Sequence, residues 1–162
     1  MTPDDDADPD VVLGALGAEL AAAITAALPG WVVRSVERRR PGDDGLEPAL
    51  AEAAQQAGAA AASDLGPVVT DLLGSDVDAQ RATPLQVVRT AVRYPTAVLR
   101  AAGVAPVPRD RFAQERFPAD PYGLTPASLE DLDPTLGELA LRWGAAKARA
   151  HRGRHRGFPG VH

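Results

Sequence analysis

Cysteine is absent from the 162 residues of this chain. This absence excludes disulfide bonds, thiolate metal sites and cysteine nucleophiles. Aromatic residues are scarce at 4%, and lysine occurs once against sixteen arginines. We attribute the arginine excess, together with the 32 alanines, to a coding bias and derive no function from it. A chain of this length fits a single domain.

Bulky apolar residues are also few. Leu, Ile, Val and Phe together supply 36 residues, a share close to the roughly 20% below which disorder is expected. The core must therefore be thin, and the many alanines favour helices whose axes approach closely. Trp31 and Trp143 are the large side chains expected to anchor this core.

The sequence has no recognisable export or membrane segment. Its N-terminus carries Asp4, Asp5 and Asp6 where a secretory signal has a positive region and an apolar run. The Ala-rich stretch 50–62 is interrupted by polar residues and is too short to span a membrane. We therefore expect a cytoplasmic protein with no membrane partner.

Charge is distributed unevenly along the chain, whose net charge is −5. Residues 1–10 hold five aspartates and no base, whereas residues 139–162 hold six bases and no acid. We expect a disordered acidic leader over 1–8, one helical domain over 9–150, and a disordered basic, Gly-rich tail over 151–162. Ends of opposite sign can attract each other within a chain, pair between chains, or stay solvated.

Apolar spacing predicts helices in the first half of the chain. Leucine and isoleucine recur at intervals of three and four over 13–28, and we expect Pro29 and Gly30 to end this helix. Residues 30–39 fit a helix or a short strand, and the periodicity does not decide between them. A loop is expected at 38–45, because the segment ends in turn formers.

The second long helix should begin near residue 46 and stop or kink at 64–67, where Pro67 interrupts it. A short apolar segment then follows and is closed by Gly74. No alternating pattern is long enough to support a sheet. The fold class predicted is all-α, an irregular bundle of about five to seven helices.

Start and stop signals are clearest in the second half. Thr83, Pro84 and Gln86 have the spacing of a capping box with proline at the first helical position. Pro95 must bend or restart this helix, and Gly103 is a suitable C-terminal residue.

Three further helices are predicted toward the C-terminus. A short one should span 109–116 and open at Asp110. The Thr-Pro pair at 125–126 should start a brief helix, and the Asp-Pro pair at 133–134 should start the last long one, whose apolar face includes Trp143.

The C-terminal part also carries a resemblance. The segments concerned are Asp76–Arg81, Thr83–Leu85, Arg93–Thr96, Leu99–Arg100, Ala102–Val104, Asp120–Tyr122, Leu124–Ser128 and Trp143–Ala148. Over roughly residues 76–148 the chain resembles a family of small actinobacterial proteins with no established activity. The resemblance implies a self-contained helical module and carries over no catalytic residue.

Arginines form the main candidate binding face. On one continuous helix Arg89, Arg93 and Arg100 would share a side, although like charges four residues apart repel one another. Such a face is suited to a phosphate, another anion or an acidic partner helix. Ordinary ion pairs with acids elsewhere in the chain are the alternative. With Tyr94, Asp120 and Tyr122, these arginines complete the set of candidate anion- or partner-binding residues.

Other kinds of chemistry have weaker support. Acids and bases concentrate at 109–122, but no two carboxylates there have a spacing that fixes them as a catalytic pair. His151 and His155 are four apart, with His162 as a remote third ligand, yet Gly153 argues against the helix that would hold them for a metal. The basic tail offers phosphates a nonspecific contact at most.

The sequence contains no catalytic signature and implies no cofactor or metal. We therefore predict a non-enzymatic protein-interaction or regulatory module that binds another protein or itself. Two alternatives stay open: a nucleic-acid-associated factor using the basic tail, and a small-ligand or anion-binding protein around Arg89, Arg93 and Tyr122.

Overall fold

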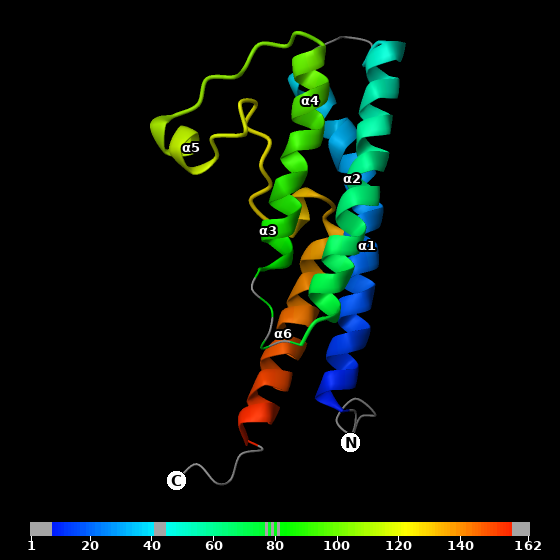
Figure 1. The fold of residues 1–162 in the computed structure, drawn as a ribbon, viewed down its shortest axis with the longest axis vertical. Helices are drawn as coiled ribbons and strands as arrows, with labels where there is room; N and C mark the ends of the chain where they lie inside the picture. Colours follow the sequence, from blue (N-terminus) through cyan, green and yellow to red (C-terminus); the bar gives the residue numbers. More distant parts are fainter. Residues whose placement is uncertain (1–7, 41–44, 77, 79, 81, 157–162) are drawn as a thin grey trace.

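The computed structural model describes residues 8–40, 45–76, 78, 80 and 82–156, with side chains described up to residue 153. The described chain is all-α, as predicted, and most of its helices run lengthwise through an elongated bundle (Figure 1). The helices are α1 (Pro9–Arg39), α2 (Pro48–Gly74), α3 (Pro84–Arg89), α4 (Arg93–Ala101), α5 (Arg111–Arg116) and α6 (Thr135–Arg156), with 3₁₀ turns η2 (Thr90–Val92) and η3 (Leu129–Asp131).

The long pair α1 and α2 is the frame of the bundle. These two helices share the most extensive contact in the molecule, and α6 and α4 pack against them (Figure 1). α6 covers the first half of α1, and α4 lies beside its second half. α5 stands to one side and has no buried residue. The beginning of α1 and the end of α6 lie at the same end of the bundle.

The core lies between these helices. From α1 it takes Leu20, Ile24 and Leu28, whose side chains are fully buried. The facing side of α2 contributes small residues, such as the fully buried Ala54 and Ala61, as often as large ones. Trp31 and Trp143, expected to be core anchors, are indeed buried, with 2% and 8% of their surface exposed.

Two glycines set how closely α1 and α2 approach. A Cβ atom placed on Gly58 would lie 2.8 Å from the carbonyl oxygen of Pro29 and 2.9 Å from its Cα. At the other end of the pair, a Cβ on Gly17 would lie 2.9 Å from the carbonyl oxygen of Leu73. Real Cβ atoms do not approach backbone this closely, so only glycine fits at either point. The helix pair therefore gains contact through backbone proximity where large side chains are few.

The helix end predicted at Pro29 is wrong, and so is a stop at 64–67, whereas the kink expected there as the alternative stays a prediction. α1 continues through Pro29 to Arg39, and α2 continues through Pro67 to Gly74. An interior proline costs a helix about 3 kcal/mol. Beyond Pro29, however, α1 buries Trp31 and Val32, each of which contributes about 2 kcal/mol. Burial therefore outweighs the proline penalty, and residues 30–39 are helix, one of the two structures the sequence allowed.

The start and stop signals between 74 and 116 are confirmed. Thr83 caps α3 with a complete capping box, and α2 ends at Gly74. The helix restarts at Arg93, after η2, so that Pro95 falls in the first turn of α4. Gly103 follows α4 with φ of +74°. Asp110 accepts a hydrogen bond from the Ala113 amide at 2.7 Å and opens α5.

Two boundaries in the last third need correction. No helix begins at 125–126, because the Thr125 amide and hydroxyl are held by Asp120 instead; the next helical turn is η3, which Ser128 caps. The last helix begins beside Asp133 as predicted, but it continues past Ala150 to Arg156. The expected disordered tail is thus helical over 151–156. Residues 1–7, 41–44 and 157–162 lie outside the described residues.

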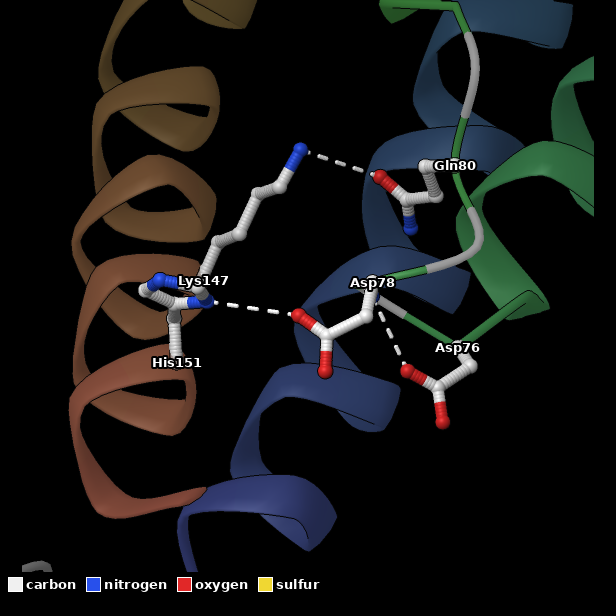
Figure 2. Close-up of polar contacts among 5 residues, drawn as sticks. All are labelled: Asp76, Asp78, Gln80, Lys147 and His151. Atoms are coloured by element: carbon white, nitrogen blue, oxygen red, sulfur yellow. Dashed lines mark hydrogen bonds and ion pairs between the residues drawn. The ribbon is translucent and has the colours of Figure 1, made fainter. Parts of the chain in front are cut away.

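The longer α6 is held against the 75–83 connection by two polar contacts (Figure 2). The Lys147 ammonium donates to Gln80 Oε1 at 3.1 Å, and His151 Nδ1 lies 3.3 Å from Asp78 Oδ1. Both side chains of the His–Asp pair are about half exposed. Such pairs contribute little individually, but they give the last turns of α6 contacts that the sequence pattern did not reveal.

One helix of the described chain is long and apolar enough to cross a membrane by length and composition. It is α1, whose most apolar 18-residue window has a mean hydropathy of 2.0 and is 33% buried. Core helices of soluble proteins and signal sequences meet the same criterion. Here the buried side of α1 packs on α2 and α6, so the helix serves as a core element of this fold.

Substitution of Gly58 tests the close approach of α1 and α2. We expect Gly58→Ala to destabilise the protein by about 1–3 kcal/mol, because the new methyl group meets the Pro29 backbone. Gly14→Ala is the matched control, since nothing lies within 4 Å of its Cβ position. That change should stabilise by up to about 1 kcal/mol through helix propensity. Urea denaturation followed by circular dichroism measures both, and equal effects would refute the argument.

Acid unfolding tests the N-terminus of α6. Hydrogen bonds from the Thr135 amide and hydroxyl to Asp133, together with the charge of Arg34, lower the pKa of Asp133 below its usual 3.8. The folded pKa lies below the unfolded one, so the carboxylate stabilises the fold above about pH 4, and this contribution is lost as pH falls through the folded pKa. Asp133→Ala should lower Tm at pH 7, and the difference in Tm between this variant and wild type should become smaller below pH 4. Glu37→Ala, an exposed acid on α1, is the control.

Candidate anion-binding site

A hollow of about 390 Å³ opens between η2, the start of α4 and the segment that follows α5. We call it the arginine pocket. Its lining residues are Arg89, Thr90, Val92, Arg93, Arg116, Phe117, Pro118, Ala119, Asp120 and Thr125. The volume is within the range of ligand and side-chain pockets.

Three guanidinium groups come to this pocket from two directions. Arg89 and Arg93 are four residues apart and flank η2, so they lie on the same side of the α3–α4 segment. Arg116 is the last residue of α5 and reaches the pocket from the opposite wall. The fold therefore adds an arginine that is distant in sequence to two that the sequence places together.

An aromatic ring lies among these arginines. The guanidinium carbon of Arg89 is 5.7 Å from the centroid of the Phe117 ring, and that of Arg116 is 5.4 Å from it. Arg116 also lies 5.7 Å from the ring of Phe112. Cation–π contacts of this kind orient the guanidinium groups without neutralising them.

None of the three arginines forms an ion pair within the described part of the chain. Two acids of the neighbouring α5 are used elsewhere: Glu115 pairs with Arg111 at 2.9 Å, and Asp110 caps the helix. Arg89 donates instead to the carbonyl oxygen of Pro126 at 3.2 Å. Three positive charges thus surround the pocket with their anion-binding capacity largely unused.

Asp120 lines the pocket, but both of its oxygens are occupied. Oδ1 accepts from the Leu124 amide at 2.9 Å, and Oδ2 accepts from the Thr125 amide and hydroxyl at 2.8 and 2.7 Å. The residue is 3% exposed. Its carboxylate accepts three hydrogen bonds from this turn and therefore fixes one wall of the pocket.

The loop segment that carries Phe117 and Asp120 is held by partly buried hydrogen bonds, within itself, to the chain that follows α4 and to α1. Arg109 donates to the Phe117 carbonyl oxygen at 2.7 Å. The Tyr122 hydroxyl donates to the Val104 carbonyl oxygen at 2.7 Å, and the Tyr122 carbonyl oxygen accepts from Arg39 Nε at 2.7 Å. This wall of the pocket is therefore preformed, which reduces the entropy lost on binding.

Arg93 also belongs to a polar chain that crosses from α4 to α2. Its Nη2 donates to the Tyr94 hydroxyl at 3.0 Å, and that hydroxyl donates to Asp64 Oδ2 at 2.6 Å. Burial and the hydrogen bond to Asp64 raise the pKa of Tyr94 above 10.0. Tyr94 is thus a neutral positioning residue for Arg93 at physiological pH.

The structure separates the six residues singled out from the sequence. Arg89, Arg93 and Asp120 line the pocket, whereas Arg100 is exposed on α4 and does not. Tyr94 points to α2, and Tyr122 is 1% exposed in the core. Arg116 and Phe117 are not among the binding residues predicted from the sequence. Both fall in the polar segment 109–122, but only the fold of α5 against η2 shows that they meet Arg89.

The pocket has the groups for binding an anion and lacks a reactive pair. Its lining contains two threonine hydroxyls and one occupied carboxylate, with no base positioned to activate a nucleophile. Within the described chain, no group of three or more His, Asp or Glu side chains could hold a metal ion. The side chains of His155 and His162 lie outside that description.

Comparison of the chain with protein-family models, with curated proteins and with solved structures finds no match. The resemblance at residues 76–148 stays a prediction, and the site is interpreted from its own geometry.

Removal of the Asp120 carboxylate tests the preformed wall. Asp120→Ala leaves the buried Leu124 amide without an acceptor, so we expect a loss of about 2–4 kcal/mol in the free energy of unfolding. Asp120→Asn retains one acceptor oxygen and should cost clearly less. Chemical denaturation of the two variants beside wild type decides this, and an Ala variant as stable as wild type would contradict the assignment.

Proposed function

We propose that the protein is a non-enzymatic interaction module whose arginine pocket binds an acidic, partly apolar segment of a partner protein. The observation that carries the proposal is the convergence of Arg89, Arg93 and Arg116 on one hollow, where none of them pairs with a carboxylate of the described residues. Guanidinium groups recognise carboxylates through paired hydrogen bonds, and a bare cluster of them favours an anion from outside.

The surroundings of the pocket favour a peptide segment over an isolated small anion. Arg93, Arg116, Pro118 and Ala119 are exposed, so the hollow opens widely to solvent. Beside it, the Phe112 side chain is 66% exposed on α5. An apolar ring next to a basic pocket suits a partner that presents an acidic residue together with an apolar one. Arginine and aromatic residues are also the types enriched in protein interfaces.

The alternative of nucleic-acid binding through the C-terminal bases has less support. Arg142 and Arg149 line a groove against α1, whereas Lys147 lies over the Trp143 ring and bonds to Gln80. These bases therefore diverge around α6 and do not form one stripe along which a phosphate backbone would run.

A cytoplasmic location is part of the proposal. The inner face of α1 is committed to the core through Leu20, Ile24 and Leu28. Removing α1 into a bilayer would expose the apolar residues of α2 and α6 that cover it, so the folded bundle favours α1 as a core helix.

Charge reversal in the pocket tests the function. Peptides selected from a random display library on the immobilised wild-type protein should be enriched in acidic residues next to apolar ones. We expect Arg93→Glu combined with Arg116→Glu to weaken binding of a selected, fluorescently labelled peptide at least about tenfold in anisotropy titrations. Wild-type affinity should also fall as salt rises.

The matched control combines Arg38→Glu with Arg100→Glu, two exposed arginines outside the pocket with the same change of net charge. This variant should keep near wild-type affinity. Equal losses of peptide affinity in both variants would show that the effect comes from net charge alone and would refute the site. If free benzoate bound as tightly as the peptides, the pocket would be assigned to a small ligand and not to a partner protein.

A further inference from the structure

A second surface, distant from the arginine pocket, lies between the first turns of α1 and the C-terminal half of α6. It is a groove of about 600 Å³ lined by Val11, Val12, Ala15, Leu16, Glu19, Arg142, Ala145, Ala146 and Arg149. We call it the α1–α6 groove. From its geometry we infer that it is the contact surface of a two-fold symmetric dimer of this chain, a function independent of peptide binding at the arginine pocket.

The groove has an apolar floor that nothing in the described chain covers. Ala15 and Ala145 are exposed on its two walls, and the Val11 side chain is 66% exposed at its end. Leu141, next to Arg142 on α6, is 75% exposed. Exposed apolar surface of this kind, bordered by charges, is typical of protein contact sites.

Charges of both signs border the groove, and each lacks an ion pair within the described chain. They are Glu19 on α1 and Arg142 and Arg149 on α6. A single acid and two bases in one groove give a surface that can complement a copy of itself. An acidic segment bound in the groove would place like charge opposite Glu19. A basic segment would place like charge opposite Arg142 and Arg149.

The order of the charges along the helices decides the symmetry. The beginning of α1 and the end of α6 lie at the same end of the bundle (Figure 1). Val12 and Arg149 therefore lie toward that end, and Glu19 and Arg142 lie further in, about 10 Å along the helix axes at 1.5 Å per residue. A two-fold axis that runs along the groove, parallel to the helices, keeps these two levels and sets α1 of each copy against α6 of the other.

Under that axis the acid of each copy comes level with the inner base of the other. Glu19 then faces the partner's Arg142, and the same pair recurs on the other side of the axis, as an isologous interface requires. Ala15 and Ala145 lie near the axis, where small side chains allow the helices of the two copies to approach closely. A contact of one groove is small, so we expect a reversible dimer.

Analytical ultracentrifugation of the full chain at rising concentration tests this. We expect a monomer–dimer equilibrium in wild type. Glu19→Arg and Arg142→Glu should each weaken dimerisation about tenfold or more, because each places like charges together twice. The variant with both changes should regain affinity close to wild type, because the reversed pair attracts again.

Controls separate this pairing from general charge effects. Glu37→Arg and Arg100→Glu make the same charge changes at exposed positions outside the groove and should leave the equilibrium unchanged. The arginine-pocket variant with Arg93→Glu and Arg116→Glu should also dimerise normally, so failure of either proposal is distinguishable from failure of the other. A wild-type chain that is monomeric throughout, or a double reversal that stays as weak as the single changes, would overturn the inference.

Discussion

The fold depends on the close backbone approach of α1 and α2. Bulky apolar residues are too few to fill a wide gap between helices, and Gly58 against Pro29 and Gly17 against Leu73 remove that gap. Backbone atoms in direct contact supply dispersion energy that the scarce large side chains cannot provide alone. All later elements build on this pair, because α4 and α6 pack on its surface and contact each other little.

Once this pair is fixed, the position of the arginine pocket follows. The α3–η2–α4 segment runs along α2 and carries Arg89 and Arg93 outward, while the chain from Val104 to Leu124 must return across its face to start α6 (Figure 1). Tyr122 and Leu124 anchor the return in the core. The intervening α5 is left outside, which places Arg116 and Phe117 opposite the other two arginines.

Local signals made much of this predictable. Thr83, Asp110 and the Asp-Pro pair at 133–134 satisfy amide groups within their own turn, so sequence alone identifies them. The helix stops expected at Pro29 and Pro67 were wrong because the cost of a proline within a helix is local, whereas the burial of side chains that outweighs this cost comes from contacts with other helices. The pocket was predictable only in part for the same reason. Arg89 and Arg93 are near in sequence, but Arg116 joins them through a tertiary turn that Asp120 closes.

The sequence concentrates bases near its C-terminus, and the structure gives these bases roles other than attraction to the acidic N-terminal end. Because α6 stays helical to Arg156, the bases after residue 139 are distributed around a rigid helix. Lys147 is used within the fold, and Arg142 and Arg149 are directed to the α1–α6 groove beside Glu19. The two basic surfaces thus differ in kind. The Asp120 carboxylate in the lining of the arginine pocket already accepts three hydrogen bonds from its own turn, so the pocket favours an acidic partner. The α1–α6 groove carries an acid, Glu19, that forms no ion pair among the described residues, and a surface with an acid on one helix and bases on the other favours its own copy.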